Sequence, residues 1–377
     1  MNPILLPVPM AQAGRVDIYS GVARRSGKLW ASLHRAGDTP TSTVVVVVHP
    51  SSNFLGHYAL DLFAGLGVDA VGMNTRYIAN DSALIMENCV VDLGAGLRYL
   101  REQGYARIVL VGNSGGGGLV AFYQSQAEAP TVRNTPAGDP PDLTAADLPA
   151  ADAVVELMAH PGRATVYTEW LDPAITDEQH PFARDPDLDL FTRTPPFDVE
   201  FVARYREAQR DRNRRITAWV RRLLDELRDA DSGAVDDLPF VVHGTCADPR
   251  FVDLTLDPSD RAAGTLWGDP FAANFLPATL GHHTSLRSWL SQWSIDESNC
   301  DGPHHLGRVT VPVLVVYGTA DQGAHPSHAR ALYDGVAHDR KELVAIAGAN
   351  HYFDGQPELA GEACARIVDW LRREGLH

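Results

Sequence analysis

The chain has 377 residues, of which 45% are hydrophobic and 21% are charged, and its formal net charge is −16 at pH 7. This composition is that of an ordinary globular protein, long enough for one large domain or for one domain that carries a sizeable insertion. The acidic balance argues against nucleic acid as the main partner, because binding to phosphates needs a positive surface.

Cysteine spacing and hydropathy exclude further classes of protein. The four cysteines lie far apart and form no C-x-x-C pair, so the sequence predicts neither a zinc site nor a disulfide framework, and the cytoplasm is the simplest location. No apolar run reaches the roughly 18 residues of a membrane span, so we expect no membrane segment. The apolar patch within residues 1–14 is a poor signal peptide, because no basic residue precedes it and prolines interrupt it.

The first predicted elements are strands. Residues 15–21 and 28–35 alternate apolar and polar side chains, which predicts an opening antiparallel pair. Residues 42–50 contain five consecutive valines. Such a run predicts a strand buried on both faces, as in a parallel sheet that helices cover on both sides.

Helices and strands then alternate. Residues 54–67 have helical spacing and end in glycine, residues 68–77 read as a strand, and residues 84–104 form a long amphipathic pattern that ends at Gly104. Residues 106–112 are another apolar strand. This alternation predicts a parallel α/β sheet.

A G-x-S-x-G motif follows that strand at residues 112–116, with Ser114 at its centre. At a junction between a buried strand and a helix, this motif forms a tight turn that holds the serine in a strained conformation and exposes its hydroxyl. The flanking positions must lack a Cβ because the strand and helix backbones crowd them. The motif therefore predicts that Ser114 is a nucleophile.

A serine nucleophile needs a base, and the base needs an acid that orients it. Two apolar strands near the carboxyl terminus are followed by candidates, Asp321 after residues 311–317 and His351 after residues 341–347. Asp248 also follows a strand and is an alternative acid. Asp321 is favoured because it lies one strand–helix unit before His351.

These motifs, "GNSGG", "YGTAD" and "GANHYF", resemble those of the α/β-hydrolase superfamily, over roughly residues 1–160 and 307–377. The resemblance implies an α/β fold with a mostly parallel eight-stranded sheet flanked by helices. It also implies a triad of Ser114, Asp321 and His351, an acyl-enzyme intermediate, and no metal or organic cofactor.

Stabilising a tetrahedral oxyanion requires two hydrogen-bond donors. The Gly115 amide is the first candidate. For the second we expect Ser51, then Ser52, in the loop after the valine strand, because the proline before them has no N–H. This loop lacks the H-G-G-G pattern of lipases, which argues against bulky lipid substrates. The polar residues expected to bind the substrate are His49, Asn53 and Asn113.

The two core segments, residues 1–162 and 307–377, enclose residues 163–306, which we expect to form a large, mainly helical cap. Trp289 and Trp293, four residues apart on a probable helix, are candidates for lining the substrate pocket. A long amphipathic helix is predicted over residues 198–230. The arginines of this helix should form a solvated face, and an arginine that turned inward would suit a substrate carboxylate. The arginines concerned are Arg210, Arg212, Arg214, Arg215, Arg221 and Arg222.

The favoured function is hydrolysis of a carboxylic ester, lactone or thioester of small to medium, apolar or aromatic character. The same triad could instead cleave an amide or a carbon–carbon bond of a diketone, and a non-catalytic ligand-binding protein could keep the same fold. The expected partner is a small-molecule substrate, with neither nucleic acid nor membrane, and a homodimer is possible. Adjacent histidines at 282–283 and 304–305 show no ligand spacing, so no metal is expected.

Overall fold

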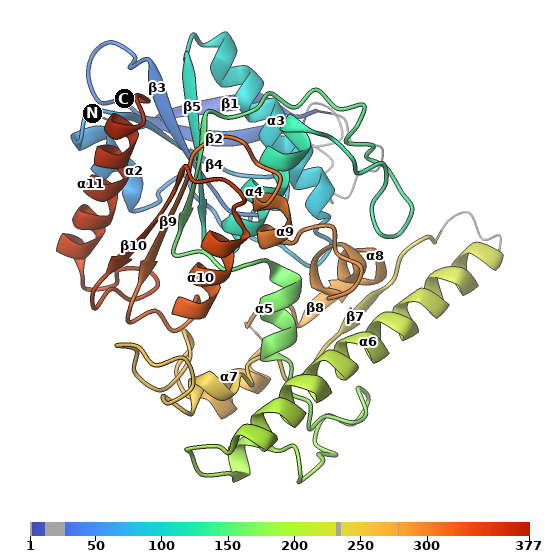
Figure 1. Cartoon of the computed structure of the whole chain (residues 1–377). Helices are drawn as coiled ribbons and strands as arrows, with labels where there is room; N and C mark the ends of the chain where they lie inside the picture. The colour runs from blue at the N-terminus through green and yellow to red at the C-terminus, as the bar shows by residue number, and fades with distance from the viewer. Residues whose placement is uncertain (1, 12–26, 231–234, 278) are drawn as a thin grey trace.

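The computed structural model describes residues 2–11, 27–230, 235–277 and 279–377. Its centre is an eight-stranded sheet with the strand order β1-β2-β4-β3-β5-β6-β9-β10 (Figure 1). The strands are β1 (Ile4–Pro9), β2 (Lys28–His34), β3 (Thr43–Val48), β4 (Asp69–Met73), β5 (Arg107–Asn113), β6 (Ala153–Leu157), β9 (Val313–Gly318) and β10 (Lys341–Ile346).

The sheet is mostly parallel, as the sequence predicts. Strands β4, β3, β5, β6, β9 and β10 run parallel to one another, whereas β2 is antiparallel to both β1 and β4. The five valines of β3 are fully buried and alternate between two hydrophobic clusters, one on each face of the sheet. The expectation of a strand buried on both faces is thus confirmed.

Helices cover both faces of the sheet. One cluster packs α2 (Ala59–Gly65) and α11 (Pro357–Arg373) against one face. The other packs four helices against the opposite face. These are α3 (Met86–Glu102), α4 (Gly116–Glu128), α9 (Gly302–Leu306) and α10 (Pro326–Gly335).

The amino-terminal edge differs from the expectation. The strand predicted at residues 15–21 lies outside the described residues, and the partner of β2 is instead β1, with Pro7 opposite Trp30. Prolines are tolerated there because β1 is an edge strand, where one side of the backbone needs no ladder hydrogen bond. The prolines obscured this strand in the sequence pattern.

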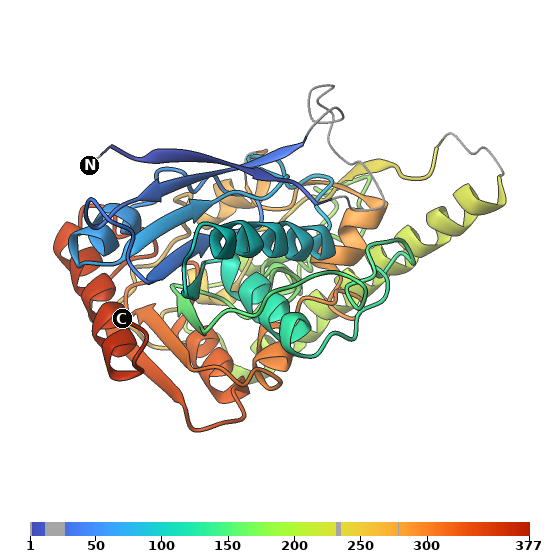
Figure 2. The same ribbon diagram turned by 90° about the horizontal axis from the view of Figure 1, so that it is seen from above.

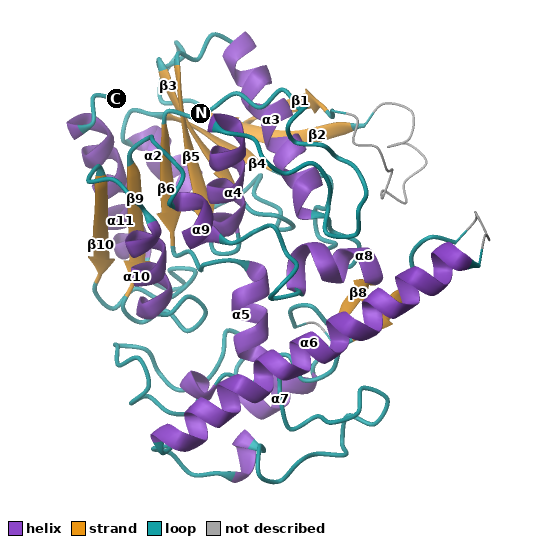
Figure 3. Ribbon diagram, turned by 45° about the vertical axis from the view of Figure 1, so that its right-hand side comes forward, coloured by secondary structure: helices purple, strands orange, loops and turns teal. Residues whose placement is uncertain are grey.

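We call residues 163–306 the cap. Its main helices are α5 (Arg163–Trp170), α6 (Val199–Asp229) and α7 (Pro270–Phe275). In Figure 3 the arrows of β9 and β10 point toward the side where these helices lie, and the carboxyl-terminal end of α6 projects away from the sheet (Figure 2). No helix in the described part of the chain is long and apolar enough to span a membrane. Besides these helices and α9, the cap contains β7 (Pro239–Val241), β8 (His283–Ser285), α8 (Leu286–Ser288), two short 3₁₀ helices (Leu190–Thr192 and Pro249–Phe251) and a π-helical turn (Trp289–Trp293).

The arginines of α6 do not all form a solvated face. Arg212 is completely buried, and its guanidinium donates to the Glu178 carboxylate at 2.6 and 2.9 Å and to the carbonyl of Asp172 at 2.9 Å. This inward arginine is therefore occupied by groups of the protein itself and does not provide the site for a substrate carboxylate that the sequence suggested.

Candidate active site

Ser114 sits in a strained turn between β5 and α4. Its backbone φ is +55°, a left-handed conformation that non-glycine residues rarely adopt. The turn is held by two backbone hydrogen bonds, in which the Ser114 N–H donates to the Leu157 carbonyl at 3.2 Å and the Ser114 carbonyl accepts from the Gly117 N–H at 3.1 Å. The serine is thus fixed at the carboxyl edge of the sheet.

The glycines beside the serine are required by close backbone approach. A Cβ on Gly116 would lie 2.1 Å from the Val48 carbonyl oxygen, and one on Gly112 would lie 2.5 Å from the carbonyl oxygen of Gly116. A Cβ on Gly117 would lie 2.2 Å from a carboxylate oxygen of Glu156. The cost of glycine in an ordered segment is offset because no larger residue fits the junction.

The structure brings Ser114, His351 and Asp321 together. The Nε2 atom of His351 lies 2.9 Å from Ser114 Oγ, and its Nδ1 atom lies 2.8 Å from Asp321 Oδ2. His351 and Asp321 are buried, and Asp321 Oδ1 accepts the amides of Gly323 and Ala324 at 2.7 and 2.8 Å. Because a carboxylate only accepts, Nδ1 carries the imidazole hydrogen and Nε2 is free to accept the serine proton.

Asp248, the alternative acid, lies in a different environment. Its carboxylate pairs with Arg206 and with Arg250, each at 2.6 Å, and also accepts the Arg250 amide at 2.9 Å. The His351 imidazole is bonded to Asp321 instead. The geometry therefore favours Asp321 as the partner of the histidine.

The loop after β3 holds its amides in an unexpected way. The backbone N–H groups of Ser51 and Ser52 donate to Nδ1 of His49, at 3.1 and 2.9 Å. In this structure the two amides expected to bind an oxyanion are thus occupied. The Gly115 amide lies at the start of α4, where the first amides of a helix have no intrahelical acceptor.

Two asparagines expected at the substrate pocket are held by other protein groups. Asn113 is buried, and its amide nitrogen donates to the Leu157 carbonyl at 3.0 Å. The Asn53 side-chain oxygen accepts from the amides of Leu55 and of Asn74 at 3.2 and 3.0 Å. Both asparagines thus brace the loops around the elbow.

Trp289 and Trp293 do not line a pocket. Both side chains are fully buried in the hydrophobic cluster of the cap, where they pack against Tyr167 and residues of α6. A side chain with no accessible surface offers none to a substrate, so the prediction that they line the pocket is wrong. Their i, i+4 spacing reflects packing of the cap core.

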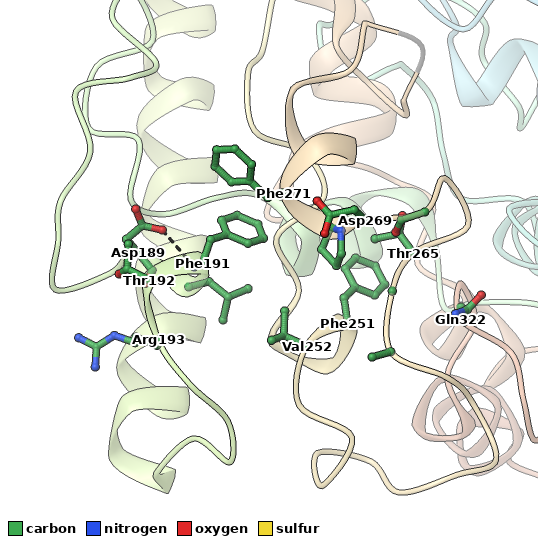
Figure 4. Close-up of a pocket in the computed structure, with 15 residues that line it drawn as sticks. Asp189, Phe191, Thr192, Arg193, Phe251, Val252, Thr265, Asp269, Phe271 and Gln322 are labelled. Atoms are coloured by element: carbon green, nitrogen blue, oxygen red, sulfur yellow. Dashed lines mark hydrogen bonds between the residues drawn. The ribbon is translucent and has the colours of Figure 1, made fainter.

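Other aromatic residues of the cap do border a cavity, of about 870 Å³ (Figure 4). Its walls include Phe191 and Phe271, and it also contacts Gln322, which directly follows Asp321 in the chain. Phe271 is half exposed. The cap therefore presents apolar aromatic surface beside the loop that carries Asp321.

His160 is a neighbour of the elbow that the sequence analysis missed. It follows β6, and its Nε2 atom lies 3.5 Å from the position a Cβ would take on Gly115. Burial, assisted by electrostatic interaction with the neighbouring His328, lowers the pKa of His160 to about 3, so the ring is neutral at pH 7. The signal available in the sequence was its place three residues after the largely apolar segment 153–157.

Glu156 is a buried carboxyl group directly beneath the elbow. It lies on β6 opposite Gly112 of β5, is completely buried, and has no hydrogen-bond partner for either oxygen among the described residues. Burial raises its pKa from 4.5 to about 8, because the charged form loses its hydration. Glu156 is thus neutral at pH 7.

This raised pKa predicts a pH-dependent stability. Between the unfolded pKa of 4.5 and the folded value of about 8, the folded protein keeps a proton that the unfolded chain has lost, so stability falls as the pH rises through this range. We expect Glu156→Gln to remove a slope of up to about 1.4 kcal/mol per pH unit. Urea unfolding of both proteins at several pH values measures it.

The matched control for that experiment is Glu102→Gln, since Glu102 lies exposed at the end of α3. This control should keep the wild-type slope. Parallel stability curves for wild type and Glu156→Gln across the same range would contradict a neutral buried carboxyl at this position.

No cluster of three or more histidine, cysteine, aspartate or glutamate side chains that could hold a metal occurs within the described residues. The four cysteines are unpaired by disulfides and buried.

Comparison with known proteins places the fold. No protein-family model matches the chain, and no curated protein matches it in sequence. Solved structures do match in fold. The esterase domain of a Rhodothermus marinus protein has a TM-score of 0.50 and 13% sequence identity, covering 99% of both chains. DcsB, solved in complex with a substrate analogue, has a TM-score of 0.52 and 13% identity, covering 92% of this chain and 95% of that one.

The α/β hydrolase GrgF from Penicillium sp. sh18 is similar at a TM-score of 0.50 and 12% identity, covering 92% of this chain and 94% of that chain. These likenesses agree with the eight-stranded, mostly parallel sheet and with the helices on both of its faces. The chain therefore has the fold of the α/β-hydrolase superfamily.

Proposed function

We propose that this protein is a serine hydrolase that cleaves a carboxylic ester of small to medium size through an acyl-enzyme. The observation that carries the proposal is the pair of hydrogen bonds joining Ser114 Oγ to His351 Nε2 and His351 Nδ1 to Asp321. A ligand-binding protein has no use for a strained serine aligned with a histidine base, and an esterase domain of similar fold supports the ester as substrate.

The proposed reaction has two halves. Ser114 Oγ attacks the ester carbonyl while His351 Nε2 takes its proton, and Asp321 stabilises the imidazolium that forms. The tetrahedral intermediate collapses, the ester C–O bond breaks, and His351 returns the proton to the departing alcohol. Water then attacks the acyl-enzyme while His351 Nε2 takes one of its protons. The bond between the acyl carbon and Ser114 Oγ breaks, His351 returns the proton to that oxygen, and the carboxylic acid leaves.

The character of the substrate is inferred from two features. The loop after β3 lacks the glycine-rich sequence of lipases, and the cap cavity has phenylalanine walls beside the loop of Asp321. Apolar and aromatic walls favour an apolar or aromatic ligand. We therefore infer short-chain or aromatic acyl esters, with lactones and thioesters of the same size in the same class.

A fluorophosphonate probe tests the nucleophile directly. Because such reagents phosphonylate activated serines, we expect mass spectrometry to find the label on Ser114 in the wild-type protein and to find it strongly reduced in His351→Ala. A folded wild-type protein that remains unlabelled would support a ligand-binding protein and contradict the proposal.

A panel of p-nitrophenyl esters of rising chain length, with anilides and diketones beside them, tests the bond that is cleaved. We expect the highest kcat/KM for short and aromatic acyl groups. Faster cleavage of the anilide or the diketone would replace the ester by an amide or a carbon–carbon bond, and fast turnover of long-chain esters would contradict the inference on substrate size.

A further inference from the structure

The imidazole of His49 is oriented by its own loop. His49 follows β3, and its Nδ1 atom accepts the amide hydrogens of both Ser51 and Ser52, at 3.1 and 2.9 Å. An imidazole nitrogen that accepts two N–H groups carries no hydrogen itself. In a neutral ring the hydrogen must then reside on Nε2.

The surroundings keep this ring neutral. Burial lowers the pKa of His49 well below its usual value, and the positive charge of Arg163 lowers it further. A single tautomer, with the hydrogen on Nε2, therefore dominates at pH 7. This identifies Nε2 as a hydrogen-bond donor and not as an acceptor.

The Nε2 atom of His49 lies close to Gly115, the residue that follows Ser114. A Cβ placed on Gly115 would be only 2.9 Å from His49 Nε2, so glycine at this position leaves room for the ring. The side chain of His49 is half-buried, so part of it remains accessible. Since the Gly115 amide is the expected first donor to an oxyanion, an N–H group this close to Gly115 is a candidate for the second.

We propose that the Nε2–H of His49 is the second donor of the oxyanion hole, acting with the Gly115 amide; this inference rests on the proposed function. Before the reaction, the backbone amides of Ser51 and Ser52 donate to Nδ1 of His49 and so orient its ring. The ring then offers Nε2–H to the oxyanion as a donor that replaces those two amides. When Ser114 attacks, the carbonyl oxygen becomes negative and accepts both hydrogen bonds. No proton is transferred to it.

The loop that orients the ring has further contacts. Arg163, the first residue of α5, donates to Ser51 Oγ at 2.7 Å, which ties the His49 loop to the cap. Phe54 packs near the imidazole with ring centroids 5.6 Å apart. A donor fixed before the reaction costs little reorganisation when charge develops, which is the condition for effective stabilisation.

His160 is the competing donor, because its Nε2 atom approaches the same position on Gly115 at 3.5 Å. Its Nδ1 atom is buried and has no hydrogen-bond partner among the described residues, so nothing there fixes the tautomer. His49 is both closer and oriented, and the observations therefore favour it.

Two substitutions of His49 test the role of its Nε2–H donor separately from the hydrogen bonds by which its Nδ1 atom holds the loop. In His49→Asn the side-chain oxygen can take the place of Nδ1 and accept the Ser51 and Ser52 amides, but nothing reaches the place of Nε2. In His49→Gln the amide nitrogen can approach that place. We expect His49→Asn to lower kcat for a p-nitrophenyl ester by about 10²- to 10³-fold with little change in KM, and His49→Gln to lose less.

A transition-state analogue provides the readout that a merely structural role would not change. A trifluoromethyl ketone forms a hemiketal with the serine, and its oxyanion occupies the hole. Its affinity should fall in His49→Asn by the same factor as kcat/KM, while binding of the carboxylic acid product stays near the wild-type value. The control is His304→Asn, since His304 lies exposed on α9, and it should behave as wild type.

The outcomes distinguish this inference from the proposed function. Wild-type kcat and analogue affinity in His49→Asn, with hydrolysis still dependent on Ser114, would overturn the role of His49 alone. A wild-type protein with neither ester hydrolysis nor serine labelling would overturn both. If neither variant folds, the Nε2–H resonance of His49 in the wild type should move downfield when the ketone binds, and an unchanged resonance would overturn the inference.

Discussion

Replacing Ser114 by alanine is expected to lower kcat for ester hydrolysis by about 10⁵- to 10⁶-fold. The substitution removes the hydroxyl oxygen that lies 2.9 Å from His351 Nε2 and leaves the backbone of the elbow in place. The residual rate should come from substrate binding and the oxyanion donors. Burst and steady-state kinetics with a p-nitrophenyl ester, at a protein concentration fixed by absorbance, measure the change.

The chain offers a matched control for this experiment. Ser125 on α4 also contacts a histidine, since its Oγ atom lies 2.6 Å from His305 Nδ1. The second nitrogen of that histidine lies 2.6 Å from the Asn299 carbonyl oxygen, so a neutral carbonyl takes the place that a carboxylate has at His351. Ser125→Ala should therefore keep the wild-type kcat. Equal losses in Ser114→Ala and Ser125→Ala would contradict the assignment of the nucleophile.

Asp321→Asn is expected to lower kcat by about 10⁴-fold. The carboxylate accepts the Nδ1 hydrogen of His351 at 2.8 Å and so keeps Nε2 free to accept the serine proton. An asparagine amide group that donates to Nδ1 would favour the opposite tautomer, with hydrogen on Nε2, and this tautomer cannot act as the base. The pH profile of kcat/KM, compared with that of the wild type, measures the loss.

The same substitution at Asp248 separates the two candidate acids. Asp248→Asn leaves Arg206 and Arg250 without their buried carboxylate, so we expect a lower midpoint of unfolding. The rate per correctly folded molecule, counted by fluorophosphonate titration, should stay near wild type. A 10⁴-fold loss in Asp248→Asn with a small loss in Asp321→Asn would reverse the roles.

The elements of the sheet could be predicted because their signals are local. Five consecutive valines fill β3, and each is buried. β-branched residues on both faces of a strand suit only a sheet that is covered on both sides. The amino-terminal pair was harder, because prolines in β1 obscure the alternation on which the prediction of a strand depends.

The cap shows where such local patterns fail. The spacing of Trp289 and Trp293 indicates that they share one face of a helix, but not which part of the protein that face meets. The same limit applies to Arg212, whose position on α6 does not show that Glu178 and three backbone carbonyls lie opposite it. Burial of a side chain depends on neighbours that are distant in the sequence.

From the sequence alone follow the strand–helix alternation, the strained turn at Ser114, and the order in which serine, acid and histidine follow their strands, because each depends on residues that adjoin in the chain. The choice between Asp321 and Asp248, the engagement of the Ser51 and Ser52 amides with His49, and the burial of the cap tryptophans required the folded molecule. The reason is physical. The partners of His351 lie 30 and 237 residues away in the chain, at Asp321 and Ser114, and burial of the tryptophans likewise depends on distant segments. The bonds of the Ser51 and Ser52 amides to His49 span only two and three residues, but they depend on the dihedral angles of an irregular loop, which no periodic pattern records.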